Sequence, residues 1–265
     1  MHPGLSQLVD SNLPAEEFVV ALQGFAARSR AVNHPLLHAF AQREFTRPEA
    51  ALKDFFGQYF FYSYRFTQYL TSVMSRLDSP QHRAQLAGNL AEETGHIDPE
   101  HAALLRGAGI NPEDVSFPHP LLFRRFLEAI GLDVAQLMGR EPDVATAAWV
   151  ETFQEVCRSP DAAQGVGALG IATEAIVRFM YANLLTAIQQ AWPQMPLRDR
   201  VFFDLHAAVD DEHAEVLRGI AMNLAQTPRG RMGLAMGTLR ALDARANFFD
   251  HMMDRLRRLD AAAQG

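Results

Sequence analysis

Cysteine is nearly absent from this sequence, and so are the marks of a secreted or membrane-spanning protein. The 265 residues include one cysteine, Cys157, which excludes an internal disulfide and any cysteine-rich metal site. No uninterrupted apolar run is long enough to cross a bilayer, and the first residues lack a basic segment followed by an apolar one. We therefore expect a cytoplasmic protein without membrane contact, in which any bound metal is held by His, Asp and Glu.

An excess of positive charge is also lacking. The net charge of −7 argues against a nucleic-acid partner, because such proteins usually carry a basic surface that replaces phosphate counterions. Hydrophobic residues make up 48% of the chain and charged residues 21%, the balance of a globular protein with a sizeable core. No stretch alternates β-branched and polar residues for long enough to predict a sheet, so we expect an all-α fold.

The helical period predicts a succession of helices without a linker between two halves. Proline dipeptides such as Ser79-Pro80 and Thr227-Pro228 separate them, because the residue before proline disfavours the helical conformation. No Gly/Ser-rich stretch or internal repeat divides the chain, and we expect one helical domain over residues 1–265. The predicted helices cover residues 15–30, 48–77, 81–95, 99–107, 120–131, 143–158, 163–190, 196–225 and 230–260.

Residues 165–170, Gly-Val-Gly-Ala-Leu-Gly, fit the spacing of a dinucleotide-binding glycine motif. That motif works only where a strand enters the glycine turn, and the preceding residues 159–164 do not form a strand pattern. We expect these small residues to let two helices approach closely.

The strongest chemical signal lies at His206, Asp210 and His213. Their spacing of four and then three residues places them on one face of a helix. Leu217 and Ile220 continue the same stripe, so the imidazoles and the carboxylate point inward, where charged groups need a partner or a metal. An exposed acidic face with salt bridges within the helix is the alternative.

A second signal is Glu174, a carboxylate in a segment that is otherwise uncharged until Arg178. Metal binding would explain a buried carboxylate at this position, and so would an ion pair with Arg178 one turn later. Arg178 is also a candidate for binding a substrate carboxylate.

A third signal is the helix that ends near Gly95. Glu93 shares the stripe of Leu86 and Leu90, whereas Glu92 falls well round the helix, so Glu93 is the inward candidate. Three histidines follow, and each is a candidate metal ligand: His96, His101 and His119. His96 forms a Glu-x-x-His pair with Glu93, a spacing found in di-iron helical bundles.

Buried carboxylates and imidazoles on several helices predict a dinuclear metal site. Oxygen and nitrogen ligands without thiolate suit iron or manganese, and two ions sharing carboxylates suit the activation of O₂. Apolar surroundings would keep water away from reactive species.

With these residues the sequence resembles the heme-oxygenase-like di-iron oxidase and oxygenase superfamily, whose fold relatives include thiaminase II and pyrroloquinoline quinone synthase. The similar segments are residues 33–36, 56–60, 89–95 and 119–126, together with Glu174, His206, Asp210 and His213. The resemblance implies a single-domain helical bundle with six metal ligands: Glu93, His119, Glu174, His206, Asp210 and His213. The first two are 26 positions apart, farther than is usual in the family, and His101 lies between them.

The resemblance further implies an oxidoreductase that uses two iron ions, or manganese, with O₂ as co-substrate. Members of the superfamily act on fatty acids, amino acids and aromatic acids, so we expect a small-molecule substrate. We also expect an external electron donor and a homodimer. Tyr59, Tyr62 and Tyr64 are expected either to pack in the core or to line the pocket.

Two other functions remain open on sequence alone. In the first, a metal-free enzyme related to thiaminase II would use the same histidines and glutamates as general acids and bases. In the second, the chain would be a helical binding protein with a contact surface on its last helix. That surface would comprise Met232, Met236, Phe248, Phe249, Met252 and Met253.

Overall fold

The computed structural model of the protein describes residues 2–208 and 211–262, apart from the side chains of residues 208, 211 and 212. Every regular element within these ranges is helical, which confirms the predicted all-α fold. In chain order the elements are α1 (Pro3–Val9), α2 (Ala15–Ala27), α3 (Pro35–Ala41), α4 (Pro48–Ser63), α5 (Phe66–Met74), α6 (Pro80–Glu93), α7 (Pro99–Gly107), α8 (Pro112–Val115), α9 (His119–Ala129), α10 (Val134–Met138), α11 (Val144–Cys157), α12 (Ala162–Val166), the π-helix η1 (Gly167–Glu174), α13 (Val177–Ala191), α14 (Leu197–Ala208), α15 (Asp211–Leu224) and α16 (Pro228–Ala262).

Prolines mark where many of these helices begin, as the dipeptide pattern predicts. Proline in the first turn loses no hydrogen bond, because its missing N–H would have had no partner within the helix. Short polar side chains cap the same ends: the Ser79 hydroxyl accepts from the His82 amide at the start of α6, and Asp98 accepts from the His101 amide at the start of α7. These caps fix the two helices that lead into the candidate site.

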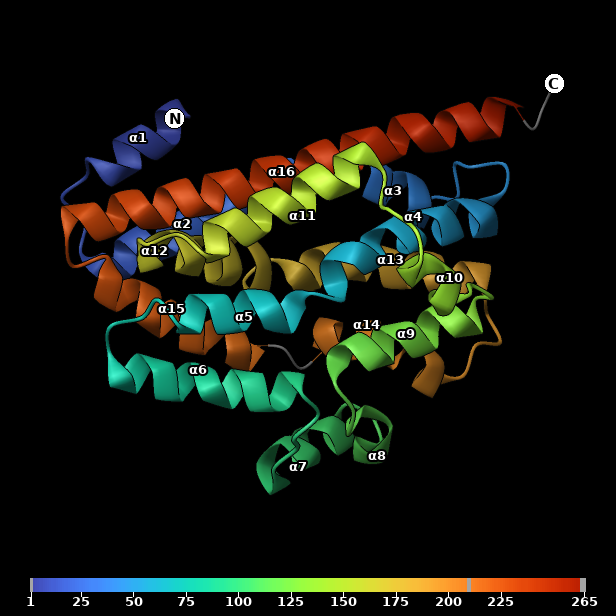
Figure 1. The fold of residues 1–265 in the computed structure, drawn as a ribbon, viewed down its shortest axis with the longest axis horizontal. Helices are drawn as coiled ribbons and strands as arrows, with labels where there is room; N and C mark the ends of the chain where they lie inside the picture. Colours follow the sequence, from blue (N-terminus) through green and yellow to red (C-terminus); the bar gives the residue numbers. More distant parts are fainter. Residues whose placement is uncertain (1, 209–210, 263–265) are drawn as a thin grey trace.

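The long helix α16 crosses the whole molecule and organises the packing (Figure 1). It packs most extensively against η1, α11 and α12, and α11 runs beside it in the view of Figure 1. On the other side of η1, α15 contacts both η1 and α6. The short helices α7 and α8 lie at the edge of the bundle, below α9 in the figure. Four of the six apolar residues at the predicted contact surface of α16 are buried, and only Met232 and Met236 are exposed.

The glycine motif at residues 165–170 is a helix-packing feature, as predicted. A Cβ atom on Gly167 would lie 2.2 Å from the Leu234 carbonyl oxygen on α16, and one on Gly237 would lie 1.9 Å from the Gln164 carbonyl oxygen. Only glycine at both places lets the backbones approach this closely. The Thr238 hydroxyl donates to the Gly167 carbonyl at 3.1 Å and closes the contact. These contacts hold the start of η1, the helix that ends at Glu174, against α16.

Three predicted helices differ from the structure. The range 48–77 is two helices, α4 and α5. The Arg65 amide donates to the Tyr62 carbonyl, and the Arg65 guanidinium donates to the Phe61 carbonyl at 2.7 Å, so the α-helical bonding of α4 ends here. The range 163–190 contains η1, whose wider turns show in the bond from the Ala175 amide to the Gly170 carbonyl. The range 196–225 contains α14 and α15, and residues 209 and 210 between them are not among the residues that the structure describes.

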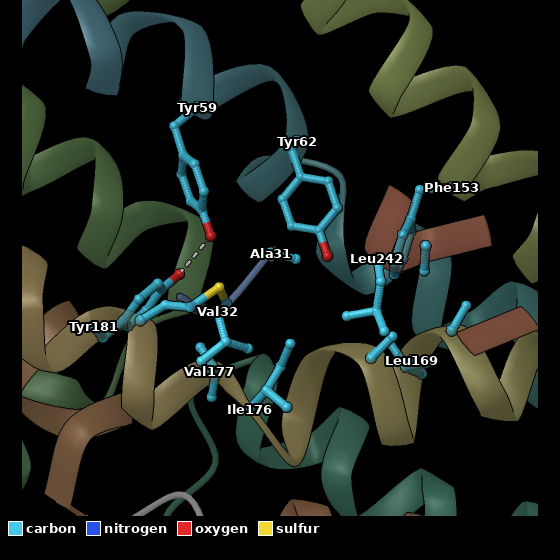
Figure 2. Packing of buried hydrophobic residues seen from close by; sticks show 14 of the residues in the cluster. Ala31, Val32, Tyr59, Tyr62, Phe153, Leu169, Ile176, Val177, Tyr181 and Leu242 are labelled. Atoms are coloured by element: carbon cyan, nitrogen blue, oxygen red, sulfur yellow. Dashed lines mark hydrogen bonds between the residues drawn. The ribbon is translucent and has the colours of Figure 1, made fainter. Parts of the chain in front are cut away.

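Aromatic rings fill the core between α4, α11, α13 and α16. Tyr62 stacks on Trp149 at 4.0 Å between ring centroids, and Trp149 stacks on Phe248 at 4.5 Å. Figure 2 shows how the hydroxyls of Tyr59 and Tyr181 meet, at 3.0 Å, with Tyr62 on the same helix as Tyr59. Residues 162–191 are long and apolar enough for a membrane span, but 61% of their most apolar window is buried inside the protein, as in a core helix.

Candidate metal centre

Gly95 explains how two residues that are distant in sequence come together. It has a φ of +93°, and a Cβ at this position would lie within 2.8 Å of the Phe117 backbone. The chain leaving α6 can therefore turn against the chain entering α9. Helices α7 and α8 form the excursion between these points, and its closure places His119 beside Glu93.

Glu93 lies at the centre of the site and is 2% exposed. Its Oε2 atom is 3.1 Å from Nδ1 of His119, and its Oε1 atom is 3.5 Å from Nδ1 of His213 on α15. The Asn89 amide donates to the His213 carbonyl at 3.3 Å, which ties α6 to α15 one turn before Glu93. The predicted inward stripe of α6 is confirmed for both Asn89 and Glu93.

Two groups of buried donor atoms are close enough to bind a metal ion each. Glu93, His119 and His206 form one group, with ligand atoms within 4.8 Å of one another. Glu93, Glu174 and His213 form the other, within the same limit. Glu93 belongs to both groups, so its carboxylate is the donor that the two groups share.

The orientation of His206 is fixed by the backbone of its own helix. Its Nδ1 atom is 2.6 Å from the Phe202 carbonyl oxygen, which can only accept a hydrogen bond. Nδ1 therefore carries a proton, so in the neutral ring Nε2 is the nitrogen that a metal would use. Phe202 also packs its ring on the imidazole, at 4.5 Å between centroids.

The inward and outward assignment of the two glutamates of α6 needs a correction. Glu92 was expected to face away from the site, yet its Oε2 atom is 3.1 Å from Nε2 of His213 and 3.1 Å from Nδ1 of His101. Glu92 lies in the last turn of α6, and its side chain points away from the apolar stripe. At this turn it meets His101 of α7 and His213 of α15. A carboxylate on the outer nitrogen of a metal-binding imidazole fixes the ring orientation, and Glu92 is in that position relative to His213.

Both glutamates are ionised over the neutral pH range. Burial raises the pKa of Glu93. The charge and the hydrogen bond of His119, together with the charges of His213 and His206, lower the pKa by more, so it lies well below its usual range. Burial likewise opposes ionisation of Glu92, and hydrogen bonds from His101 and His213 lower its pKa to about 2. Carboxylate ligands must be deprotonated to bind a metal, and both glutamates meet that condition at neutral pH.

The remaining candidates fall into three groups. Glu174 ends η1 and is buried, as predicted from its apolar segment. His96 is exposed, whereas His101 contacts Glu92. Asp210 lies outside the described residues and stays a prediction from the sequence.

A narrow cavity of about 30 Å³ adjoins the donor groups, and a wider cleft leads to the surface. Tyr59, Tyr62, Tyr181 and Phe202 line the cavity, whereas Tyr64 is exposed. The cleft, of about 420 Å³, is lined by parts of α2 and α13. Glu174, Val177 and His206 line both, so the candidate metal site lies between the cavity and the cleft. Arg245 also lines the cavity; its sequence surroundings on α16 contain many arginines, and nothing there distinguishes it.

Residues 53–246 match the sequence profile of a family described as iron-containing redox enzymes, a match that covers more than half of the chain. The protein belongs to this family. It is therefore an oxidoreductase enzyme, which favours the iron-dependent function over both the metal-free enzyme and the binding protein considered from sequence. The 4-aminobenzoate synthase of Nitrosomonas europaea is 25% identical over 224 residues, 83% of this chain and 84% of that protein. The 4-aminobenzoate synthase of Chlamydia pneumoniae is 25% identical over 227 residues, 84% of this chain and 90% of that protein.

Solved structures agree on the fold. A Shewanella denitrificans domain with a heme oxygenase-like fold superposes with a TM-score of 0.67 at 17% identity, covering 91% of each chain. A CADD-like protein of Nostoc punctiforme gives 0.69 at 16% identity, covering 91% of this chain and 98% of that one. A TenA homolog of Pseudomonas syringae gives 0.69 at 13% identity, covering 91% and 93%. The heme-oxygenase-like bundle expected from the resemblance is confirmed.

Proposed function

We propose that this iron-containing redox enzyme is a di-iron oxidase or oxygenase that uses O₂ to oxidise a small organic substrate. The observation that carries the proposal is the position of Glu93, whose carboxylate belongs to two separate groups of buried donor atoms. A single-ion site would need only one such group.

The donor set fits two iron ions. His119 and His206 would hold one ion and Glu174 and His213 the other, with Glu93 between them and Asp210 as a sixth ligand expected from the sequence resemblance. Imidazole and carboxylate ligands without thiolate suit Fe(II), and Mn(II) as an alternative. When bound, two such ions supply electrons for the reduction of O₂, and an external donor would restore them.

The protein's own residues contribute orientation and the exclusion of water. The Phe202 carbonyl fixes the His206 ring, and Glu92 fixes the His213 ring. Aromatic side chains of the cavity wall keep bulk water from one side of the site. The relatives are named for making 4-aminobenzoate, which supports an aromatic acid as a type of product. Amino acids, fatty acids and aromatic acids are the substrate types that we propose.

An anaerobic titration with Fe(II) tests the proposal. We expect about two Fe(II) per chain, and a transient near-ultraviolet to visible absorption after O₂ is admitted. His119→Ala and Glu174→Ala should each retain about one ion, because each variant removes a ligand from one group only. Glu93→Gln should lose both ions.

His96→Ala is the matched control, because this histidine lies on the same segment but is exposed. It should bind two ions like the unmodified protein. A stoichiometry of about one or less, or a Glu93→Gln variant that still binds two ions, would overturn the di-iron assignment.

A further inference from the structure

A buried positive charge lies in the cavity wall without a negative partner. Arg245 is 0% exposed and lines the same cavity as Glu93, His119 and His206. Among the side chains that the structure describes, no carboxylate lies within 4.0 Å of its guanidinium nitrogens. Burying a charge is costly unless a counter-charge compensates it, so the position calls for an explanation.

Within the described part of the chain, the hydrogen bonds of Arg245 go only to neutral groups. Nη1 donates to the Ala172 carbonyl at 2.6 Å, and Nη2 donates to the Thr173 hydroxyl at 3.1 Å and the Tyr62 hydroxyl at 3.3 Å. Nε has no hydrogen-bond partner among the described residues. The rings of Tyr62 and Trp149 lie 5.8 and 5.9 Å from the guanidinium carbon and add cation–π attraction. These neutral contacts hold the side chain in place but leave its charge unbalanced.

Phenolic hydroxyls beside Arg245 are further donors, and the Tyr62 hydroxyl would exchange its long contact with the Thr173 hydroxyl, 3.5 Å, for a ligand. Burial raises the pKa of Tyr62 and Tyr181 well above its usual value, so both phenols keep their protons at neutral pH. Tyr59 and Tyr181 bond to each other, an arrangement that uses one of their two hydroxyl hydrogens and leaves the other for a ligand. A guanidinium and neutral hydroxyl groups together form a surface suited to an anion.

We propose that Arg245 binds the carboxylate of an organic-acid substrate, with the Tyr62 hydroxyl as a second contact. The cavity of about 30 Å³ has room for a carboxylate group but not for the body of an organic acid. The body extends past Glu174 and His206 into the cleft of about 420 Å³. A carbon next to the carboxylate then lies beside the candidate metal site. This placement rests on the proposed function, whereas the binding of the carboxylate does not require metal.

Arg178 is the competing arginine, and it differs in its surroundings. It is exposed, and its guanidinium lies 4.9 Å from the centroid of the Phe179 ring at the cleft. Water and salt screen an exposed guanidinium, so its attraction for a carboxylate is weak. Arg178→Met therefore serves as the matched control for Arg245→Met.

Calorimetric titration of metal-free protein with hexanoate and benzoate, each compared with its neutral amide, tests the proposal. We expect the acids to bind more tightly than the amides. Arg245→Met should weaken acid binding by about 10–100-fold, the effect of losing a charge-assisted hydrogen bond, while amide binding stays nearly unchanged. Arg178→Met should change acid binding by less than about threefold.

Arg245 also supports η1 through the Ala172 carbonyl, so Arg245→Met is checked for folding by its thermal unfolding. Arg245→Lys retains the charge and should retain part of the preference for acids. Tyr62→Phe retains the ring and should weaken acid binding several-fold without affecting the amides. A purely structural role for Arg245 predicts that acid and amide binding fall together, which would overturn the proposal.

Equal affinity of the unmodified protein for acids and amides would also overturn it, as would loss of acid binding in Arg178→Met alone. The iron titration of Arg245→Met separates this proposal from the di-iron function. We expect about two ions in that variant. A protein that prefers acids through Arg245 but binds no iron would refute the di-iron function alone.

Discussion

Gly167→Ala perturbs the contact that positions Glu174. A Cβ at Gly167 would lie 2.2 Å from the Leu234 carbonyl oxygen and 3.0 Å from the Thr238 amide nitrogen. Relief requires η1 and α16 to separate by about 1 Å, in a region where close packing leaves no spare volume. Overpacking of this kind costs about 1–3 kcal/mol. For a domain of this size, that lowers the melting temperature by on the order of 5 °C.

Thermal unfolding monitored by circular dichroism measures this effect, with Gly88→Ala as the control. Gly88 is exposed on α6, and a Cβ there meets nothing within 4 Å. Alanine at that position should be neutral or stabilise the protein by about 0.5–1 kcal/mol, because glycine is unfavourable inside a helix. Equal melting temperatures for Gly167→Ala and the unmodified protein would refute the close-approach explanation, as would a Gly88→Ala loss of the same size.

Three further outcomes follow from particular side chains. Glu92→Gln should weaken iron affinity by about 10–100-fold while Glu93→Gln abolishes binding, and equal effects in a competition titration would contradict their separate roles. Burial opposes the ionisation of Asp143, but hydrogen bonds from Thr146 and the charge of His251 lower the pKa of Asp143 below the ordinary value. Asp143 therefore stabilises the fold above a pH of about 4, and this stability is lost as the pH falls through the pKa of the folded state. In Asp143→Asn the unfolding free energy should fall less steeply below that pH, as measured by urea unfolding, and an unchanged pH profile would exclude this contribution. Asp210→Ala should reduce bound iron while Asp211→Ala does not, and the reverse result would shift the expected ligand by one residue.

The sequence predicts much of the fold and the centre of the site, because both depend on local periodicity. Glu93 was identified by the apolar stripe of α6, and Glu174 by the absence of charge around it. His119 was chosen through the family resemblance, and its contact with Glu93 depends on the turn at Gly95 and the backbone of Phe117. Helix periodicity alone does not decide between His119 and His101.

Other features depend on contacts that no local pattern contains. The end of α4 is set by the Arg65 guanidinium on the Phe61 carbonyl, without a proline or glycine to mark it. The π-helix η1 differs from an α-helix by its bonding pattern and not by its composition. Arg245 looks like an ordinary surface arginine in the sequence, and only the packing of α16 on η1 and α11 makes it a buried residue.

Anomalous diffraction at the iron absorption edge, from crystals loaded anaerobically with Fe(II), tests the central claim most directly. We expect two peaks on either side of the Glu93 carboxylate, one near His119 and His206 and the other near Glu174 and His213. A single peak, or a peak between Glu92 and His101 with none at Glu93, would contradict it.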